Sequence, residues 1–108
     1  MHAFELLDID RHRSEQSKSY LEFLRVPALS MGLYVLPPGA VDSQTPHRED
    51  EVYYVISGRG MIRVGDEDRD VQAGSIVLAP ATVPHRFHSL TEPMQILVFF
   101  APAEGTNA

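Results

Sequence analysis

Short apolar segments alternate with turn residues along most of this chain. Leu29–Leu36 lies between Pro27 and the Pro37–Pro38 pair, and Gly65–Asp68 is flanked by strand-forming residues, as expected for a hairpin turn. Further strands are expected at Glu51–Ser57, Met61–Val64, Arg69–Val71, Ser75–Leu78, His85–Leu90 and Met94–Phe100. This regular spacing predicts an all-β sandwich or barrel, with the jelly roll among the options.

The N-terminal part of the chain follows a less regular pattern. Phe4–Ile9 is a short apolar-rich segment that we expect to form an edge strand, and the polar segment Asp10–Lys18 is expected to be a loop. In Ser19–Val26 some apolar residues have helical spacing, but the segment is too short to specify a helix. A strand or an irregular segment is therefore favoured there.

A chain of 108 residues is long enough for one domain with a single hydrophobic core. Within this single domain, 1–108, we expect residues 1–28 to form an N-terminal strand and loop segment. Residues 29–101 would form the barrel core and residues 102–108 a frayed tail. The chain has no cysteine, so disulfides play no part in its stability.

The charge pattern excludes some classes of partner. The net charge is −6 and Lys18 is the only lysine, which argues against binding to nucleic acid or to anionic membranes. The N-terminus is charged from its fifth residue and has no apolar signal region. The longest apolar run, Ile96–Ala101, is too short to cross a bilayer. We expect a soluble, cytoplasmic domain.

Two of the expected strands are apolar on both faces. In Glu51–Ser57 one face carries Tyr53 and Val55 while the other carries Val52 and Ile56, and Gln95–Phe100 is similar. A sheet with one solvated face would alternate apolar and polar residues, so the N-terminal strands or a second subunit must cover the outer face. Burial of each such side chain contributes about 1.5–3 kcal/mol. The pattern predicts a homodimer.

Candidate chemistry is concentrated in two stretches. In Gly39–Gly60, the residues His47, Glu49 and Glu51 alternate along the chain and share one face of an extended segment. An imidazole and carboxylates are suitable ligands for a divalent metal, although the same stretch also fits a hairpin entry with solvated charges. In Gly74–Ser89, a loop and strand carry His85 and His88. The two stretches suggest ligands supplied by two neighbouring strands.

These two stretches resemble the two motifs of the cupin superfamily. The resemblance is carried by Gly39, His47, Glu51 and Gly58 in the first motif and by Gly74, Pro80 and His85 in the second. The spacings agree: Glu51 lies four residues after His47 and seven before Gly58, and His85 lies five after Pro80. The chain departs from the family pattern at three positions. Thr45 stands at the first His place, Thr82 at the usual Gly and Ser89 at the usual Asn.

The resemblance implies a jelly-roll barrel, or double-stranded β-helix, with one divalent transition metal (Fe, Mn, Zn or Ni) at its mouth. His47, Glu51 and His85 are the implied ligands, and such a set leaves two or three positions open for water, dioxygen or a substrate. Glu49 is open to three interpretations: a fourth ligand, a residue that orients the ligands, or a solvated charge at the rim.

Other residues near the motifs have less specific roles. Tyr53 shares a face with Glu51 and either lines the pocket or is a core aromatic residue. Arg63, like Arg86, either binds a substrate carboxylate or is a surface charge. His88 is expected on the opposite face of the strand from His85, as a structural or rim residue.

Three functions follow from this resemblance. The first is a metal-dependent enzyme, such as a dioxygenase, isomerase or lyase, acting on a small organic molecule. The second is a non-catalytic module that binds a metal or a small ligand, as a sensor does. The third is a metal-free barrel, which the replacements at Thr45, Thr82 and Ser89 favour. Fold resemblance alone does not choose among them.

Overall fold

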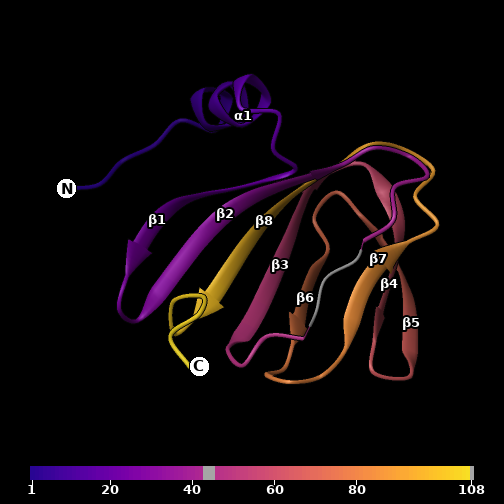
Figure 1. The fold of residues 1–108 in the computed structure, drawn as a ribbon. Helices are drawn as coiled ribbons and strands as arrows, with labels where there is room; N and C mark the ends of the chain where they lie inside the picture. Colours follow the sequence, from indigo (N-terminus) through magenta and orange to yellow (C-terminus); the bar gives the residue numbers. More distant parts are fainter. Residues whose placement is uncertain (43–45, 108) are drawn as a thin grey trace.

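The computed structural model describes residues 1–42 and 46–107, and in this part of the chain one helix is followed by eight strands (Figure 1). The elements are α1 (Leu6–Glu15), β1 (Tyr20–Val26), β2 (Leu29–Leu36), β3 (Asp50–Ser57), β4 (Arg59–Val64), β5 (Glu67–Gln72), β6 (Ile76–Ala79), β7 (His85–His88) and β8 (Met94–Ala101). Strand β2 has the bounds predicted from the sequence, and the other predicted strands of the barrel are confirmed with shifts of one or two residues at their ends. Ser19–Val26, left open between a strand and an irregular segment, forms strand β1.

The strands form two antiparallel sheets that enclose the core. The larger sheet has the order β1-β2-β8-β3-β6 and the smaller has the order β5-β4-β7 (Figure 1). Alternate side chains of β8 point between the sheets, so Ile96, Val98 and Phe100 are buried there. Ile62 and Phe87 fill the space from the smaller sheet. This is the predicted jelly roll, and strand alternation alone assigns most of its core.

The N-terminal segment contradicts the prediction of an edge strand at Phe4–Ile9 and a loop after it. Leu6–Glu15 is the helix α1, which contacts β1 and β2. Ion pairs one turn apart stabilise the helix: Arg13 lies 2.9 Å from Asp10 and Arg11 lies 3.2 Å from Asp8. The prediction was wrong because it considered the short apolar run and not the i,i+3 charge pairs, which are a helical signal.

The C-terminal segment is not frayed as predicted. We call Ala103–Asn107 the C-terminal hook, because it folds back onto β2 and the start of β3. The Glu104 N–H donates to the Ser30 hydroxyl at 2.9 Å. The backbone N–H groups of Gly105 and Asn107 both donate to the Glu49 carboxylate, at 3.1 and 2.9 Å. Ala103 is buried, so the hook is part of the packed domain.

The outer face of the larger sheet is only partly covered. Helix α1 lies at the β1 and β2 side of the sheet (Figure 1), and Ile9 and Leu33 are buried although neither belongs to the core between the sheets. At the other side Tyr54, Ile76 and Leu78 are exposed. Within the described residues, no helix has the length and apolar character needed to span a membrane.

Candidate functional site

Glu51 and His85 meet inside the barrel from opposite sheets. Glu51 points inward from β3 and His85 points inward from β7, and each side chain is only 2% exposed. The Glu51 Oε1 and His85 Nε2 atoms are 2.9 Å apart. Despite this approach, neither atom has a hydrogen-bond partner of acceptable geometry in the structure. With a protonated ring the two groups form a buried ion pair. With a neutral ring, Nε2 and Oε1 are two acceptors facing one position, which is costly unless a cation binds both.

The other nitrogen of His85, Nδ1, sets the tautomer of the neutral ring. Nδ1 lies 3.0 Å from the carbonyl oxygen of Val83. In the neutral ring Nδ1–H donates to this carbonyl, and Nε2 keeps its lone pair toward Glu51. Burial lowers the pKa of His85, but the Glu51 carboxylate and the Val83 carbonyl outweigh burial, and the net pKa is raised. Proton and metal would therefore compete for the same nitrogen.

The Glu51–His85 pair has the chemistry and spacing of two metal ligands. Ligand atoms about 2.1 Å from one ion and at right angles to each other are about 3 Å apart, which matches the 2.9 Å between Oε1 and Nε2. An imidazole and a carboxylate suit Zn, Fe, Mn or Ni. As the described residues stand, however, they contain no group of three or more His, Cys, Asp or Glu side chains arranged to hold an ion. Whether a group of three ligands can form depends on the position of the third predicted ligand, His47.

His47 lies beside the pair but not yet in contact with it. Its ring centroid is 6.3 Å from that of His85, farther than the roughly 5 Å expected for two imidazoles side by side on one ion. The ring packs edge-on against Phe100, with centroids 4.8 Å apart. Its Nδ1 faces Glu104 Oε2 at 3.7 Å. The three predicted ligands thus gather in one region, with His47 displaced toward the C-terminal hook.

The loops that carry the two motifs are tied together directly. The Thr82 N–H donates to the carbonyl oxygen of His47, and the Ala81 N–H donates to the Asp50 carboxylate at 2.8 Å. These bonds fix the His47 backbone next to the loop that leads to His85. Thr45, the position of the missing first histidine, lies outside the described residues.

Glu49 faces the C-terminal hook. Its residue is only 3% exposed, so the structure contradicts the interpretation as a solvated rim charge. Both carboxylate oxygens accept backbone N–H groups of the hook. Burial raises the pKa of Glu49, but these hydrogen bonds and the nearby His47 together outweigh burial, and the net pKa lies below its ordinary value. Glu49 therefore anchors the C-terminal hook through the backbone of Gly105 and Asn107.

The remaining candidates are distributed around the pair. Tyr53 is fully buried, with its ring 5.8 Å from that of His85 and 4.8 Å from that of Phe87. It is therefore both a core aromatic residue and a wall of the site. His88 points to the opposite side of β7 from His85, as predicted, and its Nε2 lies 2.8 Å from Asp68.

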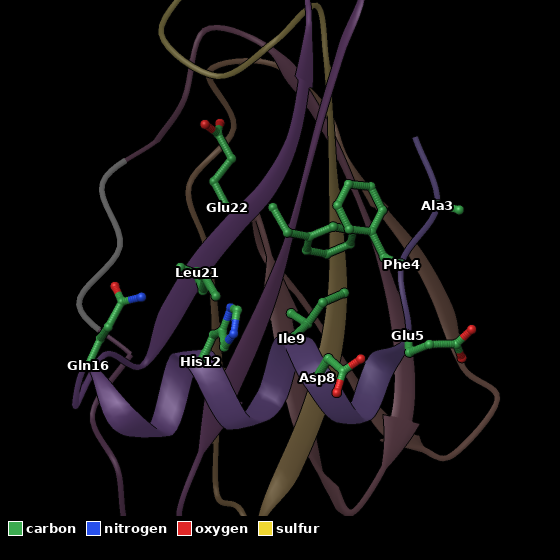
Figure 2. Close-up of a pocket in the computed structure, with 10 residues that line it drawn as sticks. Ala3, Phe4, Glu5, Asp8, Ile9, His12, Gln16, Leu21 and Glu22 are labelled. Atoms are coloured by element: carbon green, nitrogen blue, oxygen red, sulfur yellow. The ribbon is translucent and has the colours of Figure 1, made fainter. Parts of the chain in front are cut away.

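Arg63 lies away from the interior. Its guanidinium forms an ion pair with Asp68 at 2.6 Å, and with Arg86 and Pro84 it lines a hollow of about 290 Å³ that also borders His85. A second hollow, of about 470 Å³, lies between α1 and β1 (Figure 2). Figure 2 shows Ile9 pointing from α1 into this second hollow. None of the predicted ligands lines it, so its size does not make it the candidate site.

Sequence reasoning missed two residues of this region, Tyr20 and Glu104. The Tyr20 hydroxyl is buried without a hydrogen-bond partner. Burial, followed by the negative charges of Glu104 and Glu22, raises its pKa, so the hydroxyl keeps its proton. The tyrosine ring occupies the space over Gly32, where a Cβ would lie 2.1 Å from the ring. A glycine inside a strand often marks such a close approach, and Gly32 was the available signal.

Glu104 belongs to the hook and is half-buried. Burial is the main reason that its pKa is raised, with further contributions from the carboxylates of Glu22 and Glu51, while His47 acts in the opposite direction. No local pattern in the sequence pointed to Glu104, because its place depends on the return of the chain end to the barrel.

Comparison with known families agrees with this architecture. The family model of the cupin domain matches residues 32–100 of the 108 in the chain. The chain belongs to the cupin family. The family predicted from the two motifs is therefore confirmed.

Similar proteins support the same assignment. The uncharacterized protein SCO3923 of Streptomyces coelicolor is 47% identical over 105 residues, which cover 97% of this cupin and 100% of that protein. The crystal structure of TT1209 from Thermus thermophilus is 27% identical, with a TM-score of 0.75 and coverage of 95% and 99% of the two chains. The DMSP lyase DddQ of Ruegeria pomeroyi has the same fold, with 18% identity, a TM-score of 0.69 and coverage of 82% of this chain and 49% of that chain.

Two departures of this cupin from the family motifs have a visible backbone consequence. Thr82, at the usual glycine, has φ of 68°, and Ser89, at the usual asparagine, has φ of 52°. Both values lie in the left-handed region, which glycine and asparagine adopt most readily. The chain thus places residues with a Cβ at two left-handed positions on either side of β7, the strand that carries His85.

Proposed function

We propose that this cupin binds one divalent transition metal through His47, Glu51 and His85 and uses it to bind or transform a small organic molecule. The carrying observation is the pair of buried atoms, Glu51 Oε1 and His85 Nε2, that face each other at 2.9 Å without a hydrogen bond. A bound cation would satisfy both atoms at once. His47 completes the set by moving its ring toward His85.

The residues around the ion have separate roles in this proposal. The ion supplies Lewis acidity and open positions where a substrate oxygen or water binds. The Tyr20 hydroxyl keeps its proton and is free to donate a hydrogen bond to a polar atom of the bound molecule. Tyr53 and Phe100 form apolar walls that exclude water from the ligands. The interior is otherwise filled by core side chains, so the bound molecule must be small.

Two alternative functions do not involve catalysis. A non-catalytic metal-binding module would use the same ligands without turnover. A metal-free barrel would keep the same fold with the places of His47, Glu51 and His85 not occupied by an ion. The similar fold of a lyase supports the enzyme, because it indicates that such a barrel can hold a reaction site.

The proposal predicts that the purified protein retains a divalent metal. Protein prepared without added metal should contain close to one ion per chain by elemental analysis, because the buried donors are expensive to leave unpaired. Dioxygen uptake with catechols, thiols and β-diketones, and product analysis with small carbonyl compounds, then separate an enzyme from a binder. Metal-free protein that does not take up Zn²⁺, Fe²⁺, Mn²⁺ or Ni²⁺ would contradict the proposal.

We also propose that the chain forms a homodimer through the outer face of β3, β6 and β8. Tyr54, Ile76 and Leu78 are 38%, 67% and 56% exposed on this face. Strand register places Tyr54 opposite Ile76 and Val52 opposite Leu78, so the exposed side chains form one patch. Apart from Asp50, exposed at the start of β3, the outward positions of these strands carry no charged residue. The uncharged positions are Val52, Tyr54, Ile56, Ile76, Leu78, Gln95, Leu97, Phe99 and Ala101.

A second copy of the chain is the partner that fits this patch. Two molecules of net charge −6 repel each other, and a face whose outward positions are uncharged apart from Asp50 lets them approach at low cost. A stable interface needs about 800 Å² from each partner, a modest share of the 6399 Å² surface of the chain. The patch and its partly buried neighbours lie on one side of the sheet, as an interface between two sheets requires.

We predict that Ile76→Glu converts the dimer to a monomer. A charge within the patch would be buried in the interface without a partner, which should raise the dissociation constant of the dimer at least about 100-fold. Analytical ultracentrifugation at micromolar concentration measures this change. Leu7→Glu is the matched control, because Leu7 is 84% exposed but lies on α1, and this variant should remain dimeric. A monomeric wild-type chain would refute the interface.

A further inference from the structure

We propose that Glu104 of the C-terminal hook is a positioning residue for His47: its carboxylate accepts the Nδ1–H of His47 and so directs Nε2 toward Glu51 and His85. The inference rests on the proposed function, because it concerns how a metal ligand is oriented. Its starting observation is the 3.7 Å separation between Glu104 Oε2 and His47 Nδ1. This distance is too long for a hydrogen bond and shortens when the ring turns to meet an ion.

The hook holds the Glu104 backbone at both of its polar groups. The N–H of Glu104 donates to the hydroxyl of Ser30, a residue with no exposed surface. The carbonyl oxygen of Glu104 accepts a hydrogen bond from Arg25 at 2.7 Å. With both backbone groups fixed, the side chain of Glu104 starts from a defined place at the mouth of the barrel.

Glu49 fixes the residues that follow. Its carboxylate accepts the N–H groups of Gly105 and Asn107, and the Asn107 side chain donates to the carbonyl oxygen of Arg48 at 3.2 Å. These contacts join the hook to the short segment that carries His47. Glu104 and His47 are therefore held on two pieces of backbone that are bonded to each other, which favours a constant geometry between them.

The two histidines then have equivalent surroundings. His85 presents Nδ1 to the carbonyl of Val83 at 3.0 Å, which leaves Nε2 toward Glu51. His47 presents Nδ1 to the carboxylate of Glu104. Metal-binding histidines usually donate their second N–H to a carbonyl or carboxylate, which fixes the tautomer and the ring orientation. Glu104 supplies for His47 what Val83 supplies for His85.

An independent observation also points to a bound cation beside His47. Two buried atoms that can act as metal ligands, Glu51 Oε1 and His85 Nε2, face each other at 2.9 Å.

The first test measures Zn²⁺ affinity by competition with a chelator. Glu104→Ala should weaken Zn²⁺ binding about 10–100-fold, as expected for loss of a partner behind a ligand. Glu104→Gln keeps an acceptor oxygen and should recover most of this loss. Glu92→Ala is the control, because Glu92 is an exposed residue paired with Arg59 far from the site, and its affinity should equal that of the wild type. Equal affinities for wild type and Glu104→Ala would overturn the inference.

The second test needs no metal. Nitrogen-15 NMR of the metal-free protein reports the tautomer of His47. The negative charge of the Glu104 carboxylate, 3.7 Å from Nδ1, should already favour the Nδ1–H form in the wild type, and Glu104→Ala should shift the population toward the Nε2–H form. An unchanged tautomer would overturn the role of Glu104 even if Zn²⁺ affinity fell, since Glu104 would then act as a direct ligand. If the tautomer of His47 differs between the wild type and Glu104→Ala but the wild type binds no Zn²⁺, the proposed function is refuted and the Glu104–His47 contact is established.

Discussion

The His85→Ala variant should lose tight Zn²⁺ binding, with affinity reduced by more than about 100-fold. Loss of a ligand exceeds the 10–100-fold effect of losing a residue behind one. His47→Ala should behave similarly, because the proposed site has only three protein ligands. Chelator competition and elemental analysis of the purified variants measure the loss. The matched control is His88→Ala on the same strand, whose side chain lies on the outer face against Asp68 and should leave Zn²⁺ affinity unchanged.

Removal of His85 has a second effect on the folded state. Glu51 is 2% exposed and would be left as a buried carboxylate with no partner, which typically destabilises a protein by about 3–5 kcal/mol. Glu51→Gln separates the two effects, since it removes the charge of one ligand while keeping its shape. This variant should lose Zn²⁺ affinity with a smaller loss of stability. Full metal occupancy in both His85→Ala and Glu51→Gln would mean that the ligands are wrongly assigned.

Gly58→Ala should destabilise the fold by about 3 kcal/mol or more. Gly58 joins β3 to β4 with φ of 94°, a conformation that strains any residue with a Cβ. In addition, a Cβ would lie 2.1 Å from the carbonyl oxygen of Pro93 and 2.7 Å from the Cα of Met94. These are backbone atoms of a paired segment, so they cannot move aside as a flexible side chain would. Urea unfolding monitored by circular dichroism measures the change.

Gly74→Ala is the matched control for this effect. Gly74 has nearly the same φ, 93°, but an added Cβ would meet nothing within 4 Å. It should therefore show the backbone strain alone, about 1–2 kcal/mol. The difference between the two variants measures the clash with Pro93. Equal losses of stability would show that the turn after β3 can relax, and that Gly58 is required only for its φ.

Prediction from the sequence succeeded where local pattern and geometry coincide. The turn residues and short apolar segments placed the barrel strands to within one or two residues of their observed ends. In β3, Tyr53 and Val55 share a face with Glu51, and all three are buried. The spacing between His47, Glu51 and His85 also predicted that residues from two motifs gather in one region, since each motif is anchored to a strand of known direction.

Prediction failed where a contact joins distant parts of the chain. Residues after Pro102 are polar and lie at a terminus, which normally indicates fraying. In the described part of this tail, Gly105 and Asn107 instead donate their N–H groups to the Glu49 carboxylate, more than fifty residues away. Glu104 reaches His47 only as a result of this return. The apolar run before Ile9 was interpreted as a strand because its helical charge pairs were given no weight.

The amino-acid sequence by itself determined the β-rich architecture and the cupin motifs, because these follow from short-range periodicity and spacing. Strands β3 and β8 are apolar on both faces, so the tertiary structure decided which face points inward. Tertiary structure decided which polar atoms remain unsatisfied in the interior. It brought Glu51 and His85 within 2.9 Å of each other, placed Tyr20 over Gly32 and returned Glu104 to His47. Such contacts depend on the relative position of two sheets and a chain end, which no local pattern specifies.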